Sequence, residues 1–389
     1  MKNTPEMRFA GYTGAWERRK LGEVVNRVSA QSNADDLPKV EFEDIVSGEG
    51  RLNKDITNKF DNRKGILFEP GNILYGKLRP YLKNWLFADF NGIALGDFWV
   101  FESVCTAPIF NYYLIQTDKY QEIANLSTGT KMPRSDWNVV SDADFFIPST
   151  KEEQTVIGEF FRTQDEGIRL HQRKLEGLRE MKRGYLQQMF PQAGERAPRV
   201  RFAGFDGEWE QRRLGEVADV KMCRRIFNEE TSASGDIPFY KIGTFGGTAD
   251  AYITQEKFEE YKEKYPYPEI GDVLISAAGT IGRTVVYRGE KEYFQDSNIV
   301  WLKTDKTRLA NIFLEQFYEI ADWSGLEGTT IKRLYNATML ATMIKLPSLA
   351  EQAAIGEFFR TLDGQVEAQA GKVEQLKRLK AAYLQKMLV

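Results

Sequence analysis

The chain has few of the side chains on which hydrolytic enzyme centres and disulfide scaffolds depend. Its 389 residues include one histidine, His171, and two cysteines, Cys105 and Cys223. There is no HExxH segment, no CxxC pair and no clustered set of metal ligands, which argues against metal or triad hydrolysis, a zinc knuckle and a disulfide framework. So few cysteines fit a reducing compartment. We therefore expect neither catalytic nor metal-binding residues.

Several longer signals are also missing. The sequence has no GxxxxGK[ST] phosphate loop, no S-adenosylmethionine glycine motif and no Asn/Asp-Pro-Pro-Tyr/Phe tetrapeptide, so neither an ATP motor nor a methyltransferase is indicated. It has no run of about 18 uncharged apolar residues, and Met1–Thr13 is too polar for a signal peptide. These absences predict a cytoplasmic protein that does not interact with membranes.

The net charge is also low for a protein that would bind nucleic acid. The formal charge is −3, whereas phosphate binding needs concentrated positive charge. Any DNA-binding face must therefore be a local patch. The segment Gly71–Asn84 is a candidate because it has three cations and no acid, while Glu41, Glu43 and Asp44 stand together as a surface turned away from phosphate would.

What the sequence does contain is an internal repeat. RFAGYTGAWERRKLGEV from Arg8 returns as RFAGFDGEWEQRRLGEV from Arg201, 193 residues later, and IGEFFRT begins at both Ile157 and Ile355. At this length at least two domains are expected. Between the shared borders the two halves diverge, apart from framework echoes such as Gly71-Asn-Ile-Leu against Gly271-Asp-Val-Leu. Constant borders with variable interiors favour a two-headed reader over a duplicated enzyme.

A helix start signal opens the second shared border of each half. Thr150 precedes Glu153 and Ser348 precedes Glu351, as in the capping box, where hydroxyl and carboxylate each satisfy a free backbone amide. Apolar residues then recur at alternating steps of four and three, typical of a coiled-coil seam. The expected helix-pairing residues are Ile157, Phe161, Ile168, Leu175, Leu178 and Tyr185 in the first helix, and Ile355, Phe359, Leu362, Val366, Val373, Leu376 and Tyr383 in the second.

Pairing of the two repeats about an approximate two-fold axis would make these helices antiparallel. At ~1.5 Å per residue the seam from Ile157 to Met189 would be roughly 48 Å long, more than the ~34 Å of one DNA turn. The helices would then act as a ruler between two half-sites with an unread gap. The same helices could instead be core elements of one ordinary domain.

Small and polar residues interrupt the predicted seam. Each glycine in the first helix weakens it by ~1 kcal/mol relative to alanine, so tertiary partners are expected to help; these are Gly158, Gly167, Gly177 and Gly184. We interpret His171 as a packed or polar seam residue. Lys182 and Lys380 occupy matching positions and are expected to snorkel or to mark where a partner packs.

The variable interiors read as α+β, with short β-rich runs, Gly/Pro turns and one helical stretch each, near residues 107–126 and 308–323. Two stretches in each half combine cations with side chains that can reach base edges, although each single residue could equally be a plain surface residue. The candidate DNA-binding residues are Tyr75, Lys77, Arg79, Tyr81, Lys83, Lys131, Arg134 and Ser135 in the first half, and Thr280, Arg283, Arg288, Lys332, Arg333 and Asn336 in the second.

The repeated borders resemble those of a known family. IPSTKEEQTVIGEFF from Ile147 and LPSLAEQAAIGEFF from Leu346 resemble the conserved helical regions of type I restriction-modification specificity subunits, and the openings at Gly14 and Gly207 resemble the starts of that family's two target recognition domains. The resemblance covers essentially the whole chain. It implies target recognition domain 1 at 1–148, helical region 1 at 149–190, target recognition domain 2 at 191–346 (with 191–200 as linker) and helical region 2 at 347–389.

The implied fold class is α+β: two globular α/β target recognition domains separated by two long helices that pair as an antiparallel coiled coil, in a pseudo-two-fold internal repeat. The implied function is sequence-specific recognition of double-stranded DNA, one domain for each half of a bipartite asymmetric site, with the helices docking two methyltransferase subunits. Restriction/translocation subunits would complete the complex. S-adenosylmethionine, ATP and Mg would belong to those partners, and this chain would hold no cofactor and would not be an enzyme.

Three alternatives remain open. The chain could be a duplicated DNA-binding subunit of an orphan methylation system or of another DNA machine. It could be a stand-alone nuclease built from scattered acidic residues, or a coiled-coil scaffold without DNA affinity.

Overall fold

The computed structural model describes residues 4–57, 59, 61–126, 131–323 and 333–388, and it divides into two compact units. Unit 1 consists of residues 1–174 and 369–389, and unit 2 of residues 175–368. The chain has two 39-residue helices, α5 (Lys151–Met189) and α9 (Leu349–Met387). One part of each helix belongs to unit 1 and the other part to unit 2. The globular part of unit 1 is called domain 1 below, and that of unit 2 domain 2.

Domain 1 is built around a sheet that is buried on both faces. In β8 and β11, alternate residues belong to two different apolar clusters: Ile73 and Tyr75 face the helices, whereas Leu74 faces a second sheet. This two-residue alternation between cores explains why Ile73–Tyr75 and Phe98–Phe101 are continuously apolar. The strand orders are β2-β11-β8-β9, β3-β7-β10-β4, β1-β12 and β5-β6.

The elements of domain 1 have the following bounds. The strands are β1 (Glu17–Lys20), β2 (Val25–Arg27), β3 (Gln31–Ser32), β4 (Lys39–Val40), β5 (Ile45–Val46), β6 (Arg51–Leu52), β7 (Gly65–Phe68), β8 (Ile73–Gly76), β9 (Trp85–Phe87), β10 (Gly92–Ala94), β11 (Phe98–Ser103) and β12 (Asp144–Ile147). The helices are α1 (Leu21–Val24), α2 (Pro108–Leu114), α3 (Asp118–Ala124) and α4 (Trp137–Asp142), with 3-10 turns η1 (Phe42–Asp44) and η2 (Pro80–Leu82).

Domain 2 repeats the central arrangement. Its sheet β14-β20-β17-β18 is likewise covered on both faces, with Ile275 in one apolar cluster and Leu274 in another. Its strands are β13 (Glu210–Arg213), β14 (Ala218–Lys221), β15 (Ile237–Tyr240), β16 (Ala251–Ile253), β17 (Val273–Ser276), β18 (Thr284–Val286), β19 (Tyr293–Phe294), β20 (Ile299–Thr304) and β21 (Met343–Leu346). Its helices are α6 (Gln255–Lys264), α7 (Asn311–Ile320) and α8 (Asn336–Ala341), with 3-10 turns η3 (Leu214–Glu216) and η4 (Asn228–Glu230).

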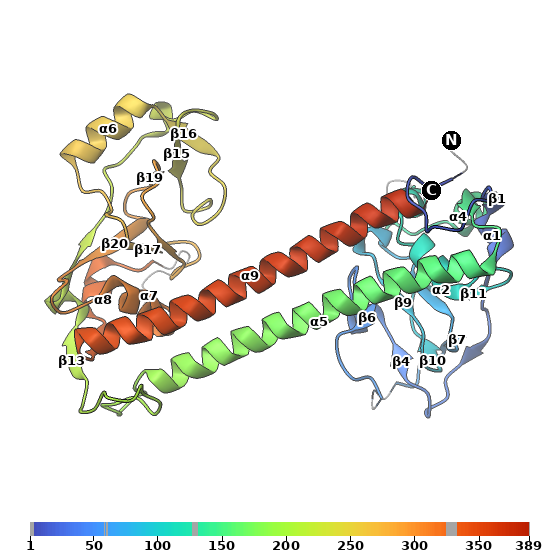
Figure 1. Cartoon of the computed structure of the whole chain (residues 1–389), viewed down its shortest axis with the longest axis horizontal. Coiled ribbons are helices and arrows are strands. Elements are labelled where there is room, and N and C mark those ends of the chain that lie inside the picture. The colour runs from blue at the N-terminus through green and yellow to red at the C-terminus, as the bar shows by residue number, and fades with distance from the viewer. Residues whose placement is uncertain (1–3, 58, 60, 127–130, 324–332, 389) are drawn as a thin grey trace. The chain divides into compact units, whose positions relative to one another are not determined.

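In unit 1 the first part of α5 runs antiparallel to the last part of α9 (Figure 1). Three successive contacts fix the direction: the Phe160 and Tyr383 ring centroids are 5.3 Å apart, Asp165 Oδ1 is 2.6 Å from Lys380 Nζ, and His171 Nδ1 is 2.8 Å from Gln369 Nε2. In unit 2 the remaining parts pair in the same way, through Lys182 with Asp363 and Tyr185 with Phe358.

The start of each long helix is tied to its own domain by a glutamate and a glutamine. The predicted capping boxes form only in part: the Glu153 and Glu351 amides donate to Thr150 Oγ1 and Ser348 Oγ, both at 3.3 Å. The two carboxylates do not cap backbone amides but accept from Arg8 and Arg201 instead. Beside them, Gln154 Oε1 accepts from the Ala107 amide at 2.7 Å and so anchors the start of α2.

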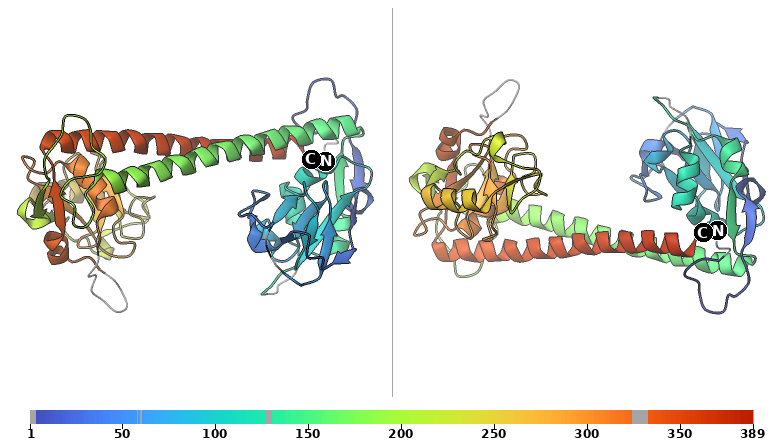
Figure 2. Two further views of the ribbon diagram at one scale, coloured as in Figure 1. Left: turned by 90° about the horizontal axis from the view of Figure 1, so that it is seen from below. Right: turned by 90° about the horizontal axis from the view of Figure 1, so that it is seen from above.

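One glycine in each long helix allows a domain helix to approach closely. A Cβ atom on Gly158 would lie 2.4 Å from Ile109 Cγ2, and one on Gly356 would lie 2.6 Å from Ile312 side-chain atoms. Cβ positions on Gly167, Gly177 and Gly184 would meet nothing within 4 Å. Gly158 is therefore required by the packing of α2 on α5. Figure 2 shows the first part of α5 beside domain 1 from two sides.

The predicted single helical stretch in each interior is too simple. In domain 1 the stretch is broken into α2 and α3 because Thr117 ends one helix and accepts from the Tyr120 amide as the N-cap of the next. In domain 2 the stretch forms α7, and the polar helix α6 was not expected. The fold class itself is confirmed, since mixed helix-and-sheet domains are joined by two long helices.

Candidate nucleic-acid interface

In domain 1 three loops that are distant in sequence are bonded into one surface. The loop after β8 pairs with residues 133–135 through the antiparallel bridge between Leu78 and Arg134. Ser135 N donates to Lys77 O at 2.8 Å, and Lys77 N donates to Asp97 O at 2.9 Å. We call residues 77–83, 131–135 and 96–97 the three-loop surface of domain 1.

Domain 2 repeats the same backbone frame. The bridge is between Ala278 and Arg333, Leu334 N donates to Ala277 O at 2.8 Å, and Ala277 N donates to Asn298 O at 2.7 Å. Residues 276–283, 333–336 and 297–298 therefore form the three-loop surface of domain 2. The structure thus brings together the two stretches that sequence chemistry singled out separately in each half.

The three-loop surface of domain 1 contains a strained turn. Arg79 and Lys83 bracket η2 with φ values of 49° and 54°, a left-handed conformation that is costly for residues with a Cβ atom. In domain 2 the position of Arg79 is taken by Gly279, with a φ of 64°. The left-handed backbone at this one position is therefore common to both domains, whereas domain 1 places a cation on it.

The predicted contact residues of domain 1 divide into exposed and buried ones. Arg79, Lys83 and Lys131 are exposed, as is Tyr81 at 55%, and Lys77 is half-buried. Two predictions are corrected: the Tyr75 side chain is 0% exposed and stacks on Trp99, and Ser135 is buried with its hydroxyl donating to Ala124 O. Tyr75 follows the aromatic pattern of the loop but points into the core, because it belongs to β8.

The predicted residues of domain 2 also differ in environment. Thr280 and Asn336 are exposed, and Arg283 is exposed but donates to Phe245 O at 2.8 Å. Arg333 is half-buried and donates to Ser297 O. Arg288 lies in a pocket that Glu290, Glu292, Glu315 and Glu367 also line, where carboxylates compete with any phosphate for its charge. Lys332 lies outside the described residues.

Sequence reasoning missed Asp97. Its carboxylate accepts from Arg134 Nε and Nη2, at 3.2 and 2.9 Å, and lies 3.6 Å from Lys77 Nζ. No sequence signal marks it, because an isolated Asp in a Gly-Asp turn is common in any loop. Only the fold brings it between two candidate cations.

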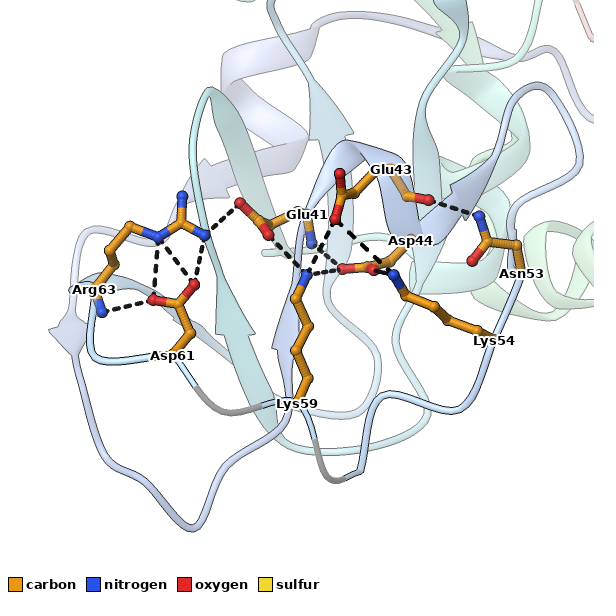
Figure 3. A network of polar contacts seen from close by, with 8 residues as sticks. All are labelled: Glu41, Glu43, Asp44, Asn53, Lys54, Lys59, Asp61 and Arg63. Carbon is orange, nitrogen blue, oxygen red and sulfur yellow. Dashed lines mark hydrogen bonds and ion pairs between the residues drawn. The ribbon is translucent and has the colours of Figure 1, made fainter.

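Other cations of domain 1 are already paired with acids. Figure 3 shows Lys59 bonded to Glu41 and Asp44, both at 2.7 Å, with Lys54 2.8 Å from Asp44 and Arg63 bonded to Glu41 and Asp61. Hydrogen bonds from Arg63 lower the pKa of Asp61 to about 2. The acidic cluster therefore holds the side chains of Lys54, Lys59 and Arg63, which agrees with its interpretation as a surface that does not face phosphate.

The predicted helix-pairing positions fall into two groups. Ile157 and Phe161 are buried against domain 1 and the end of α9, and Ile355 and Phe359 are buried against domain 2 and the end of α5. Further along the helices Ile168, Leu175, Leu362 and Val373 are buried, while Leu178, Tyr185, Val366, Leu376 and Tyr383 are half-buried. The ends of the seam therefore pack both a helix and a domain.

Lys182 and Lys380 form interhelical ion pairs rather than snorkelling to solvent. Burial opposes the charge of Lys182, but Asp363 and Glu319 outweigh it and raise its pKa. Burial lowers the pKa of Lys380, although Asp165 favours the charged form. The difference follows from sequence, since Lys380 meets the neutral Gln116 where Lys182 meets Glu319.

Among the described helices none is both long and apolar enough to cross a membrane. Comparisons with known proteins bear on function more directly. Residues 206–378 match the family model described as the type I restriction modification DNA specificity domain. Over these residues the chain is similar to the DNA specificity domain of type I restriction-modification systems. The resemblance recognised in the repeated borders is thereby confirmed, and the matched region includes the three-loop surface of domain 2.

Individual relatives agree with this similarity. A Haemophilus influenzae protein named as a type I restriction enzyme specificity subunit is 54% identical over 156 residues, 39% of this chain and 40% of that protein. The MjaVIII specificity subunit of Methanocaldococcus jannaschii is 22% identical over 71% of this chain and 69% of its own length. This chain therefore covers 40% of the length of the Haemophilus influenzae relative. The S subunit of M. genitalium shares the fold, with a TM-score of 0.63, 16% identity and 99% coverage of both chains.

Proposed function

We propose that this chain is the sequence-reading subunit of a type I restriction-modification complex. Domain 1 and domain 2 each read one half of a bipartite, asymmetric site in double-stranded DNA. The observation that carries the proposal is the three-loop surface, whose backbone bonds recur in both domains while its side chains differ. A shared frame can supply similar phosphate contacts, whereas different side chains read different bases.

The proposed contacts are the accessible members of these surfaces. In domain 1 the surface carries four cations besides Arg134, together with the exposed Tyr81, so phosphate neutralisation dominates there. In domain 2 the loop Ser276–Arg283 is rich in small residues, and Gly279 and Gly282 both have positive φ values, which lets backbone approach a groove closely. The proposed contact residues are Lys77, Arg79, Tyr81, Lys83, Lys131 and Arg134, and Thr280, Arg283, Arg333 and Asn336.

The long helices are proposed to set the gap between the half-sites and to dock two methyltransferase subunits. Met181 and Leu379 occupy equivalent helix positions and are 42% and 41% exposed, so each would offer an apolar side chain to such a partner. S-adenosylmethionine would bind those partners, and ATP and Mg would bind restriction subunits. The chain itself would act in the cytoplasm without performing chemistry.

The decisive experiment maps methylated adenines across the genome of the host, with and without this chain. We expect one bipartite motif to lose methylation when the chain is deleted, and a methyltransferase to copurify with the tagged chain. Unchanged methylation together with no copurifying methyltransferase would refute the type I assignment. Salt-insensitive or absent DNA binding by the purified complex would favour a scaffold instead.

A further inference from the structure

The guanidinium of Arg134 is held in one orientation by Asp97. Arg134 Nε and Nη2 both donate to Asp97 Oδ2, at 3.2 and 2.9 Å, and the Arg134 side chain is nevertheless 53% exposed. The backbone of Asp97 is itself held, because its carbonyl accepts from the Lys77 amide at 2.9 Å. The exposed arginine on the three-loop surface is therefore preorganised rather than free to rotate.

The donors that remain on Arg134 match one base. A guanidinium has five N–H groups, of which Nε–H and one Nη2–H are used by Asp97. The other Nη2–H and the two Nη1–H groups stay available at the end of the fork away from Asp97. Two parallel donors of this kind fit O6 and N7 of guanine in the major groove.

The charge of Asp97 argues for a base contact rather than a phosphate contact. A phosphate is attracted by net positive charge and tolerates many donor directions. Pairing with a carboxylate removes much of that net charge, but it fixes the donor direction on which bidentate base recognition depends. The arrangement therefore gives up backbone affinity for directional specificity.

Domain 2 holds an arginine at the corresponding place in its own surface. Arg333 Nη2 donates to Ser297 O at 2.8 Å, and Ser297 has a φ of 55° where Gly96 of domain 1 has 90°. The arginine position is thus common to both surfaces, while the acceptor that orients it changes from a carboxylate to a backbone carbonyl.

We propose that Arg134 donates to a guanine in the half-site read by domain 1, and that Asp97 is a positioning residue that sets this preference. The inference rests on the proposed DNA-reading function and adds the identity of the base. Arg134 would contact DNA, whereas Asp97 would act through Arg134.

The test is selection from a randomised DNA duplex library by the tagged full chain, purified from its host with the partners it retains. Wild-type complex is expected to enrich a guanine in one half-site. In Arg134→Ala and Arg134→Lys, preference at that position should fall roughly ten- to a hundredfold. Asp97→Asn should lower the same preference and strengthen binding to unrelated DNA, because an acid is removed. Arg333→Ala should affect the other half-site only.

The outcomes separate the two levels of inference. No enriched sequence with wild-type complex would overturn the DNA-reading function itself. A bipartite motif that Arg134→Lys leaves unchanged would keep that function and overturn the guanine assignment, because lysine preserves the charge and loses the fork. Loss of a base other than guanine would overturn it as well, as would an Asp97→Asn variant with unaltered base preference.

Discussion

Arg8 and Glu153 form a bidentate ion pair across 145 residues of sequence, with Nε–Oε1 and Nη2–Oε2 distances of 2.6 and 2.7 Å. The Trp16 indole donates to the same carboxylate, which is 2% exposed. Arg201 and Glu351 repeat the pair in unit 2 at 2.7 Å for both bonds. In each repeat the arginine that opens the shared segment is thus bonded to the first turn of the long helix.

Removing one partner should leave a buried charge. We expect Arg8→Ala to destabilise unit 1 by about 3 kcal/mol, the usual cost of an uncompensated buried ion, and Arg201→Ala to do the same to unit 2. Hydrogen exchange of the amides in each unit would localise the loss. The double variant Arg8→Ala with Glu153→Gln should recover part of it. Equal loosening of both units by the single Arg8 change would contradict the assignment.

Replacing two glycines of α5 by alanine should change the stability of the protein in opposite directions. Gly158→Ala places a methyl group 2.4 Å from Ile109, so we expect about 1 to 3 kcal/mol of destabilisation from overpacking. Gly167→Ala meets nothing within 4 Å and should stabilise the helix by up to ~1 kcal/mol. Urea denaturation of both variants measures the contrast. A Gly158→Ala variant as stable as Gly167→Ala would show that α2 does not need this close approach.

Substitutions at Arg79 are expected to change the stability of domain 1 and its affinity for DNA in opposite directions. Arg79→Gly should stabilise domain 1 by up to ~1 kcal/mol, because the left-handed backbone is strained for a residue with a Cβ atom. The same change should weaken DNA binding at every sequence and reduce the slope of log affinity against log salt by about one. Thermal unfolding and a salt titration of binding check the two halves. Arg79→Ala is the control, with weaker binding and no gain in stability.

The acidic pocket of domain 2 should make its stability depend on pH. Burial and the nearby Glu290 raise the pKa of Glu292 to about 7 from an ordinary value of 4.5. Between these values the folded state keeps a proton that the unfolded state has lost, so stability should fall as pH rises through this window. Burial also raises the pKa of Glu315, which lines the same pocket and acts in the same direction.

Glu292→Gln should remove much of this dependence. We expect the variant to be more stable than wild type near pH 8 and similar near pH 5. Near pH 8 the wild-type carboxylate is ionised in its buried site, which costs stability, whereas the glutamine side chain stays neutral. Denaturation midpoints across this range are the measurement. Glu290→Gln, which removes the second cause, should give a smaller change. Parallel pH profiles for wild type and Glu292→Gln would contradict the prediction.

How far the sequence predicts this structure depends on the range of the signals. The repeat and its four-three apolar spacing predicted the long helices because both are local or self-similar patterns. Tyr75 could not be placed, since an aromatic residue in a basic loop and one at a strand end look alike in sequence. The partner of Glu153 was also unpredictable. The sequence predicted that its carboxylate accepts from a backbone amide, but in the fold it accepts from Arg8, 145 residues away.

The role of Asp97 shows the same limit at the candidate site. The basic stretches around Lys77 and Arg134 were found separately from their composition, yet nothing in either stretch indicates that they meet. The Leu78–Arg134 bridge joins them, and the β8–β11 pairing brings the Gly96-Asp97 turn beside the loop after β8. Charges that look free in sequence are therefore partly compensated once the sheet forms.

The paired long helices are expected to set the gap between the two half-sites. Ion pairs Lys380–Asp165 and Lys182–Asp363 fix the register of α5 against α9 within each unit, so both helices must be shortened together. Removing residues 172–178 and the equivalent 370–376 deletes two turns from each helix, and it nearly preserves which face points inward because seven residues are close to two full turns. At ~1.5 Å per residue the shortening is about 10 Å, or about three base pairs at ~3.4 Å each.

We expect the motif selected by the doubly shortened chain to keep both half-sequences and to have a gap shorter by up to this amount. Removal of residues from α5 alone should disrupt the pairing of the helices. An unchanged gap in the doubly shortened chain would refute the spacer role while leaving the reading domains intact.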